Sequence, residues 1–170
     1  MPVQEEVIPF LLGDDYDVIA LAQTGTGKTA AFGLPILQKI DVTTYHPQAL
    51  VLCPTRELCL QIADDLNDYS KYIDNLKVLP VYGGSSIESQ IKTLKRGVHG
   101  VVATPGRLLD LMNRKTVDLS LVKNVIMDEA DEMLNMGFTD SINPILAEVP
   151  ENRNMLLFSA TRPKEIATIT

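Results

Sequence analysis

The sequence predicts an α/β domain with a doubly wound, mainly parallel sheet that helices cover on both faces. Short apolar runs alternate with helix-compatible segments along the whole chain. The run at residues 49–53 shows no polar alternation, which is typical of a strand buried on both faces of a parallel sheet. A polar or glycine-containing cluster follows each run. Because ligands bind outside the carboxyl ends of such strands, these clusters predict where the function lies.

The elements follow from this alternation in chain order. The apolar runs predict strands at residues 17–22, 49–53, 77–82, 100–103, 124–127 and 154–158. Helical spacing predicts helices at residues 3–12, 27–40, 86–96, 105–114, 141–148 and 163–170, and one that starts after residue 55. Thr55 is the expected N-cap of that helix, since its hydroxyl can accept a first-turn N–H. His46 and His99 are expected in surface turns, without a catalytic role.

Length and charge limit the functional classes. The chain has 170 residues, which suits one domain with a substantial core. Its net charge of −7 argues against a protein that binds polyanions through overall charge. Residues 85–115 nevertheless carry six basic and two acidic side chains. The alternative for that segment is an ordinary solvated helix face.

The two cysteines and the hydropathy predict a compartment. Cys53 and Cys59 are too few for a disulfide scaffold and lack metal-site spacing, so we expect a reduced, cytoplasmic protein. Cys53 falls in an apolar run and is expected in the core. No apolar run approaches the length of a membrane span, and no secretory signal pattern is present.

Residues 22–29 predict a phosphate-binding loop, because they lie between an apolar run and a helix-compatible run. Glycines let successive N–H groups point into one concavity, and the following helix aims its positive end there. Lys28 can reach the terminal phosphates and Thr29 can ligate Mg²⁺. The alternative is an ordinary glycine-rich turn. The predicted loop consists of Ala22, Gln23, Thr24, Gly25, Thr26, Gly27, Lys28 and Thr29.

Asp128 and Glu129 follow the apolar run at residues 124–127. Nucleotide hydrolysis needs a carboxylate near Mg²⁺ and a group that positions or deprotonates the attacking water. Asp128 suits the first role and Glu129 the second. Alone, the pair could simply cap the next turn. Together with a phosphate-binding loop about 100 residues earlier, it predicts an ATPase-type site.

The sequence Asp128-Glu129-Ala130-Asp131 spells the motif that names the DEAD-box RNA helicases, and the chain resembles that family over essentially its whole length. Ala22, in place of the usual glycine of the phosphate loop, is the family's own form. The resemblance is to the N-terminal RecA-like domain, a P-loop NTPase fold, of bacterial members. The other matching motifs stand in the family's order: Pro54-Thr55-Arg56-Glu57-Leu58, Gly83-Gly84, Thr104-Pro105-Gly106-Arg107 and Ser159-Ala160-Thr161.

The resemblance implies an ATP–Mg²⁺ site with named roles. Lys28 would contact the β- and γ-phosphates, while Thr29 and Asp128 would hold Mg²⁺ and Glu129 would activate water. Gln4 would read the adenine edge, although the aromatic residue that stacks on adenine in the family is absent here. Without the resemblance, Gln4 is a surface residue of a first helical turn. The residues that would link nucleotide state to domain closure and RNA are Asp131, Ser159 and Thr161.

The resemblance also implies a track for one RNA strand. It would contact phosphates rather than bases, and so would bind independently of sequence. For Arg56, a salt bridge within the fold is the alternative. The track would consist of Pro54, Thr55, Arg56, Gly83, Gly84, Thr104, Pro105, Gly106 and Arg107.

The family core has a second RecA-like domain, which this sequence does not include. We therefore expect residues 1–170 to be the ATP-binding domain of a monomeric ATP-dependent RNA helicase, nearly inactive as an isolated domain. The parent would couple ATP binding and hydrolysis to RNA binding and local duplex unwinding. An ATP-gated RNA clamp and, less favoured, a DNA translocase remain the alternatives.

Overall fold

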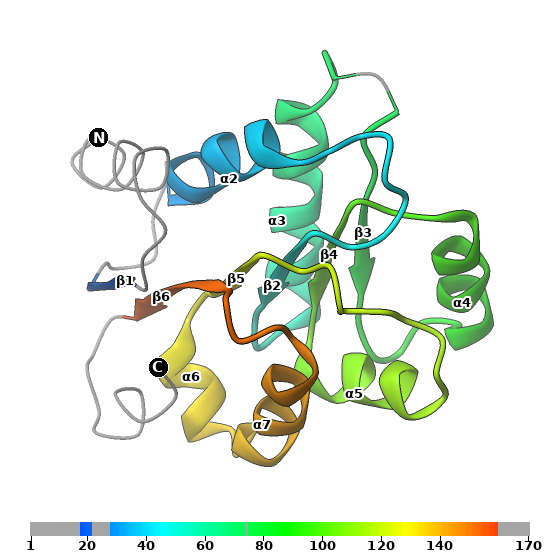
Figure 1. Ribbon diagram of the computed structural model, residues 1–170. Helices are drawn as coiled ribbons and strands as arrows, with labels where there is room; N and C mark the ends of the chain where they lie inside the picture. The colour runs from blue at the N-terminus through cyan, green and yellow to red at the C-terminus, as the bar shows by residue number, and fades with distance from the viewer. Residues whose placement is uncertain (1–17, 22–27, 74, 160–170) are drawn as a thin grey trace.

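The sheet is six-stranded and parallel throughout. The structure is a computed structural model and describes residues 18–21, 28–73 and 75–159 (Figure 1). The strand order is β1-β6-β5-β2-β4-β3, and every neighbouring pair is parallel. The predicted fold class and all six predicted strands are confirmed. The strands are β1 (Val18–Leu21), β2 (Ala49–Leu52), β3 (Val78–Val81), β4 (Gly100–Ala103), β5 (Asn124–Met127) and β6 (Asn154–Ser159).

Helices cover both faces of the sheet, as predicted. In Figure 1, α2 and α3 lie above the sheet, and α5, α6 and α7 lie below it. The α4 helix packs its apolar side into the same core as α5 and α7. The predicted helices at residues 3–12 and 163–170 lie outside the described residues. The described helices are α2 (Lys28–Lys39), α3 (Arg56–Tyr69), α4 (Ile87–Arg96), α5 (Pro105–Asn113), α6 (Ala130–Asn135) and α7 (Thr139–Glu148).

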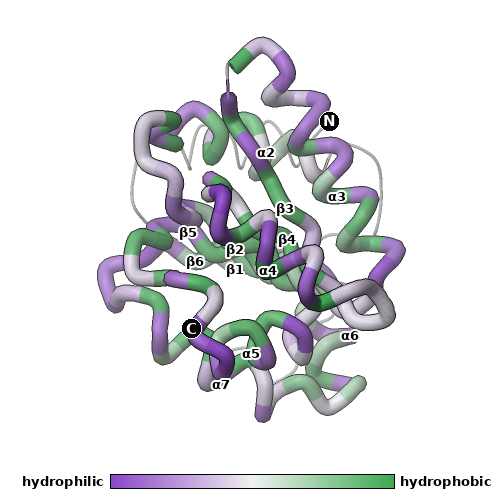
Figure 2. Tube along the Cα trace, turned by 90° about the vertical axis from the view of Figure 1, so that its right-hand side faces the viewer, coloured by the Kyte–Doolittle hydropathy of each residue, from purple (hydrophilic) through white to green (hydrophobic). Residues whose placement is uncertain are grey.

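The β2 strand contributes side chains to two separate cores, because successive side chains of a strand point to opposite faces. Leu50 and Leu52 of β2 face the core under α4–α7, whereas Val51 and Cys53 face the core under α2 and α3. All of these side chains are almost completely buried. Figure 2 shows hydrophobic segments gathered in the strands at the centre of the molecule. Burial on both faces explains why the strands read as continuous apolar runs.

The start of α3 follows the prediction, whereas α6 was not predicted. The Thr55 hydroxyl accepts a hydrogen bond from the Leu58 N–H at 3.2 Å, which confirms Thr55 as the N-cap. The α6 helix has six residues and begins after Glu129, which adopts a left-handed backbone conformation. So short a helix carries too little periodicity to be recognised from its sequence.

His99 corrects one prediction, because it is buried rather than in a surface turn. Its Nδ1 accepts a hydrogen bond from the Lys77 N–H at 3.0 Å. The other ring nitrogen, Nε2, lies 3.0 Å from the Val42 carbonyl oxygen and so donates to it. The ring also packs 4.9 Å from the Tyr45 ring. His46 is exposed, as predicted.

Both cysteines are free and buried, and Cys53 lies in the core as predicted. A hydrogen bond with Cys59, together with burial, raises the pKa of the Cys53 thiol. Cys53 is therefore a neutral core residue at physiological pH. Among the described helices, none has the length and apolar character needed to cross a membrane.

Candidate functional site at the carboxyl edge of the sheet

The predicted clusters gather at one edge of the sheet, because all parallel strands end there. The strand order divides this edge into two parts. The "acidic half" lies at the ends of β5 and β6 and contains Asp128, Glu129, Asp131 and Ser159. The "glycine–arginine half" lies at the ends of β2, β4 and β3. Its predicted residues are Pro54, Thr55, Arg56, Gly83, Gly84, Thr104, Pro105, Gly106 and Arg107.

Asp128 is a buried carboxylate at the tip of β5. Its N–H continues the sheet by donating to the Leu52 carbonyl at 2.9 Å. Its side chain is 1% exposed, and Oδ1 accepts the Glu129 N–H at 3.0 Å. Burying a carboxylate costs free energy unless hydrogen bonds or a cation compensate for it. Asp128 is therefore a deeply buried carboxylate at the carboxyl edge of the sheet.

Glu129 turns the chain from strand to helix within one residue. Its φ of 53° and ψ of 49° lie in the left-handed region, which costs a residue with a side chain about 1–2 kcal/mol. Such conformations are concentrated at functional sites, where surrounding packing maintains them. The Glu129 side chain is half-buried, next to the deeply buried Asp128.

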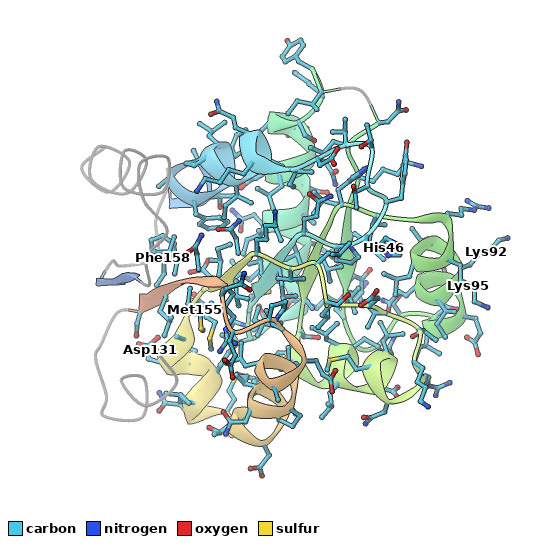
Figure 3. All side chains as sticks on the ribbon, in the orientation of Figure 1. His46, Lys92, Lys95, Asp131, Met155 and Phe158 are labelled. Carbon is cyan, nitrogen blue, oxygen red and sulfur yellow. The ribbon has the colours of Figure 1, made fainter. Side chains whose placement is uncertain are left out.

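Asp131 lies in the first turn of α6, a helix that contacts β6, and Ser159 is the last residue of β6. Asp131 is 6% exposed, and its Oδ1 accepts the Glu132 N–H at 3.0 Å. Figure 3 shows Asp131 beside the end of β6, where Ser159 is buried. Thr161, the third residue predicted for coupling, lies outside the described residues.

The β1 strand ends two strands away from β5, at a distance of about 10 Å by ordinary strand spacing. The α2 helix begins at Lys28, close to the predicted position. The half-buried Thr29 hydrogen-bonds to Asp65 of α3. Burial and the nearby Asp68 raise the pKa of Asp65, and the Thr29 bond offsets part of that increase. Gln4, residues 22–27 and the side chain of Lys28 lie outside the described part of the chain.

Three helices begin in the glycine–arginine half, directly after β2, β3 and β4. The free N–H groups of a first helical turn attract anions. Thr55 caps α3, and Ser86 caps α4 by accepting the Ser89 N–H at 3.3 Å. The α5 helix begins with Pro105, and Thr104 gives it no side-chain cap.

The glycine backbone in this half is open to solvent. Gly83, Gly84 and Gly106 are all exposed. A Cβ atom built at Gly83 or Gly106 would meet no atom of the described residues within 4 Å. Gly84 has a φ of +83°, a conformation that strongly favours glycine. A phosphate could therefore approach these backbone N–H groups closely.

The two arginines of this half have different environments. Arg56 is exposed, and its guanidinium carbon lies 5.0 Å from the centre of the Tyr82 ring. Within the described residues Arg56 forms no ion pair. One terminal nitrogen of Arg107 donates to both the Ser85 carbonyl and the Gln90 Oε1, each at 3.0 Å.

The basic side chains of residues 85–115 are mostly solvated. Figure 3 shows Lys92 and Lys95 on the side of α4 that faces away from the sheet. Arg114 pairs with Asp110 at 3.1 Å on the surface of α5. The alternative of a solvated helix face therefore describes most of this segment, and Arg107 connects it to the edge.

Tyr82, Ser85 and Gln90 also belong to this half, through hydrogen bonds that the sequence did not predict. Gln90 is 5% exposed and lies on the side of α4 that also carries Ile87 and Ile91. A polar residue on the apolar side of a predicted helix was the available signal, since such a side chain needs hydrogen-bond partners.

Comparisons with known proteins agree on one family. The DEAD/DEAH box helicase family model matches residues 1–169. The chain is 53% identical over 168 residues to the ATP-dependent RNA helicase DeaD of Mycobacterium tuberculosis. It is 56% identical over 168 residues to the DEAD-box ATP-dependent RNA helicase CshA of Streptococcus pneumoniae. These alignments cover 99% of this chain but only 30% and 32% of the relatives, so the chain spans about a third of their length.

Solved structures give the same result for the fold. A DEAD box protein from Methanococcus jannaschii has a TM-score of 0.90 and 45% identity, over 98% of this chain and 45% of that protein. A hypothetical ATP-dependent RNA helicase from Sulfolobus tokodaii has a TM-score of 0.87 and 46% identity, over 98% of this chain and 48% of that protein. The sheet order, the motifs at its carboxyl edge and these matches lead to one conclusion: the chain belongs to the DEAD/DEAH box helicase family.

Proposed function

We propose that this chain is the ATP-binding domain of an ATP-dependent RNA helicase, with the N-terminal RecA-like position in a longer protein. The observation that carries the proposal is the division of one sheet edge into two chemically different halves. The buried Asp128 and Asp131 lie on one side, and exposed glycines, two arginines and the starts of three helices lie on the other. The relatives that are about half identical over this region are named as ATP-dependent RNA helicases, which supports the same reading.

The acidic half would bind ATP–Mg²⁺ together with residues 22–29. Mg²⁺ usually takes one or two protein carboxylates and completes its shell with waters and substrate phosphates. Asp128 fits this pattern as a buried acid, whereas the described residues contain no larger cluster of ligating side chains. When bound, the metal would neutralise negative charge on the phosphates. Lys28 would contact the phosphates, and Thr29 would ligate the metal.

Glu129 would orient the attacking water and accept its proton. Its left-handed backbone turns the chain sharply, so that its side chain leaves the strand end next to Asp128. The pairing assigns two roles to two neighbouring acids, one toward the metal and one toward water. Gln4 would select adenine, and Asp131, Ser159 and Thr161 would connect the nucleotide to the RNA-binding half.

The glycine–arginine half would hold one RNA strand by its phosphates. Open glycine backbones and the N-termini of α3 and α5 supply N–H donors. Arg56 and Arg107 add positive charge in a chain whose net charge is −7. Since none of these groups reads a base edge, binding would be independent of sequence.

A second RecA-like domain would complete the enzyme. An arginine supplied across the cleft accelerates phosphoryl transfer by about 10³–10⁵-fold in related chemistry. The 170-residue chain alone should therefore bind nucleotide weakly and hydrolyse it very slowly. We further propose that the parent acts as a monomer in the cytoplasm, where both cysteines stay reduced.

The test is an RNA-dependent ATPase and unwinding assay on the full-length protein, with Lys28→Ala as the control. We expect RNA to stimulate hydrolysis, a short duplex to separate, and the variant to lose both activities. ATP-dependent RNA binding without strand separation would favour the clamp alternative. Equal stimulation by matched DNA and RNA strands would favour a DNA translocase. Unchanged ATP affinity in Lys28→Ala would contradict the assigned phosphate site.

A further inference from the structure

The glycine–arginine half has three clusters, which are residues 54–56, residues 83–84 and residues 104–107. A small network of side chains connects them. We propose that Gln90 is a positioning residue. It would hold the Gly83-Gly84 loop against the start of α5, so that the clusters meet an RNA backbone as one preformed surface. This inference rests on the proposed function, because it concerns how the RNA-binding half is built.

Gln90 bridges two of the clusters through both ends of its side-chain amide. Its Nε2 donates to the Tyr82 carbonyl at 3.2 Å, directly before the two glycines. Its Oε1 accepts from Arg107 at 3.0 Å, and the same arginine nitrogen donates to the Ser85 carbonyl at 3.0 Å. The carbonyl before the Gly83-Gly84 pair is therefore held by α4, and the carbonyl after it is held by α5.

Tyr82 brings the third cluster into the network. Its backbone carbonyl is held by Gln90, while its ring lies 5.0 Å from the Arg56 guanidinium carbon. A Cβ atom added at Gly84 would lie 3.9 Å from a terminal nitrogen of Arg56. Arg56 thus rests against both the tyrosine ring and the glycine loop.

The network would raise RNA affinity by ordering the loop before RNA arrives. A loop with two adjacent glycines has high conformational entropy when it is free, and fixing it only on binding would weaken the complex. Gln90 is 5% exposed, so it acts on RNA through the loop and not by direct contact. Within the described chain, Arg107 uses one terminal nitrogen for these bonds, which leaves its other N–H groups for phosphate.

The experiment replaces Gln90 by methionine in the full-length protein, which keeps the side-chain length and removes both hydrogen bonds. We expect the affinity for single-stranded RNA to fall about tenfold, whereas the KM for ATP should stay within about twofold. The same substitution at the exposed Gln38, at the far end of α2, is the matched control and should change neither quantity.

A purely structural role is separated from positioning by the salt dependence of RNA binding. The slope of log affinity against log salt decreases by about 0.7 for each phosphate contact that is lost from a single strand. We expect a shallower slope for Gln90→Met. A lower melting temperature with an unchanged slope and unchanged RNA affinity would show Gln90 to be a structural residue only, and would overturn the inference.

Gln90→Glu provides a second variant in case the methionine variant does not fold. It keeps the acceptor for Arg107 and loses the donor to Tyr82, so RNA affinity should fall by about threefold. Wild-type RNA affinity in a folded Gln90→Glu or Gln90→Met variant would reject the inference alone. Failure of the wild-type protein to bind RNA would reject the proposed function as well.

Discussion

The two halves of the carboxyl edge differ in how far their polar groups are buried. In the acidic half, two carboxylates are buried, Asp128 at 1% and Asp131 at 6% exposure. In the glycine–arginine half, the glycines and Arg56 are exposed, and the first turns of α3 and α4 carry Glu57 and Glu88, both of them exposed. The helices of the two halves also begin differently: α6 packs against β6 and follows the left-handed Glu129, whereas α3 and α4 follow the side-chain caps Thr55 and Ser86.

This contrast teaches what each kind of ligand requires. A metal–triphosphate complex is small and highly charged, and electrostatic interactions with it are strongest where water is excluded. A nucleic-acid backbone is long and must be approached along an open surface by many donors. The same topology provides both, because neighbouring strands differ in how their following helices begin.

The largest expected effect is in the acidic half. Glu129→Gln in the full-length protein should lower the rate of RNA-stimulated ATP hydrolysis by about 10²–10⁴-fold, since it removes a proton acceptor and keeps the shape. ATP affinity should change little. The control is Glu132→Gln, which alters an exposed acid of α6 one turn away. Equal activity losses in the two variants would show that negative charge in general, and not a specific role of Glu129, supports hydrolysis.

The second effect concerns stability at the opposite edge of the sheet. His99→Leu should lower the free energy of unfolding by about 2–4 kcal/mol, because it leaves the Lys77 N–H and the Val42 carbonyl without partners. Chemical denaturation measures this loss. His46→Leu, at an exposed position, should stay within about 0.5 kcal/mol of wild type. Similar losses for both histidines would be inconsistent with the buried hydrogen-bond network.

Gly84→Ala probes the glycine loop. Its φ of +83° should make alanine unfavourable by about 1–2 kcal/mol. We expect lower stability together with weaker RNA binding, while ATP affinity stays unchanged. Denaturation and RNA titrations on the same preparation check both parts. If the variant is less stable but binds RNA as the wild type does, the Gly83-Gly84 loop does not contribute to RNA binding.

Gly106→Ala has the smallest expected effect and separates binding from folding. Gly106 lies in the first turn of α5, where a methyl group would meet no described atom within 4 Å. Alanine should raise stability by about 0.5–1 kcal/mol, because glycine is unfavourable in a helix. RNA affinity should still fall by about threefold, because the methyl group would occupy space that a phosphate needs. An increase in both stability and RNA affinity would contradict that placement.

The fold could be predicted from sequence because its signals are local. Apolar runs indicated the strands, and Thr55 marked the start of α3 through its own hydroxyl. The positions of Asp128 and Arg107 at one edge followed from parallel topology alone. Their roles toward ATP, Mg²⁺ and RNA stay predictions.

What could not be predicted depends on contacts between distant segments. His99 is buried because residues 42 and 77 supply hydrogen-bond partners that no local pattern reveals. The bonds of Arg107 likewise join it to residues 17 and 22 positions away. The α6 helix was not predicted, because its start depends on the left-handed conformation of Glu129. No sequence pattern indicates that conformation in a residue other than glycine.

The division of the edge can be tested most directly by mapping ligand contacts on the isotopically labelled 170-residue chain by NMR. Titration with Mg²⁺–ATP should shift backbone amides of residues 22–29 and 128–131. Titration with a short single-stranded RNA should shift those of residues 54–56, 83–85 and 104–107. Two separate sets of shifted amides are the expected result. RNA-induced shifts centred on Asp128, or nucleotide-induced shifts centred on Gly83 and Gly84, would contradict it.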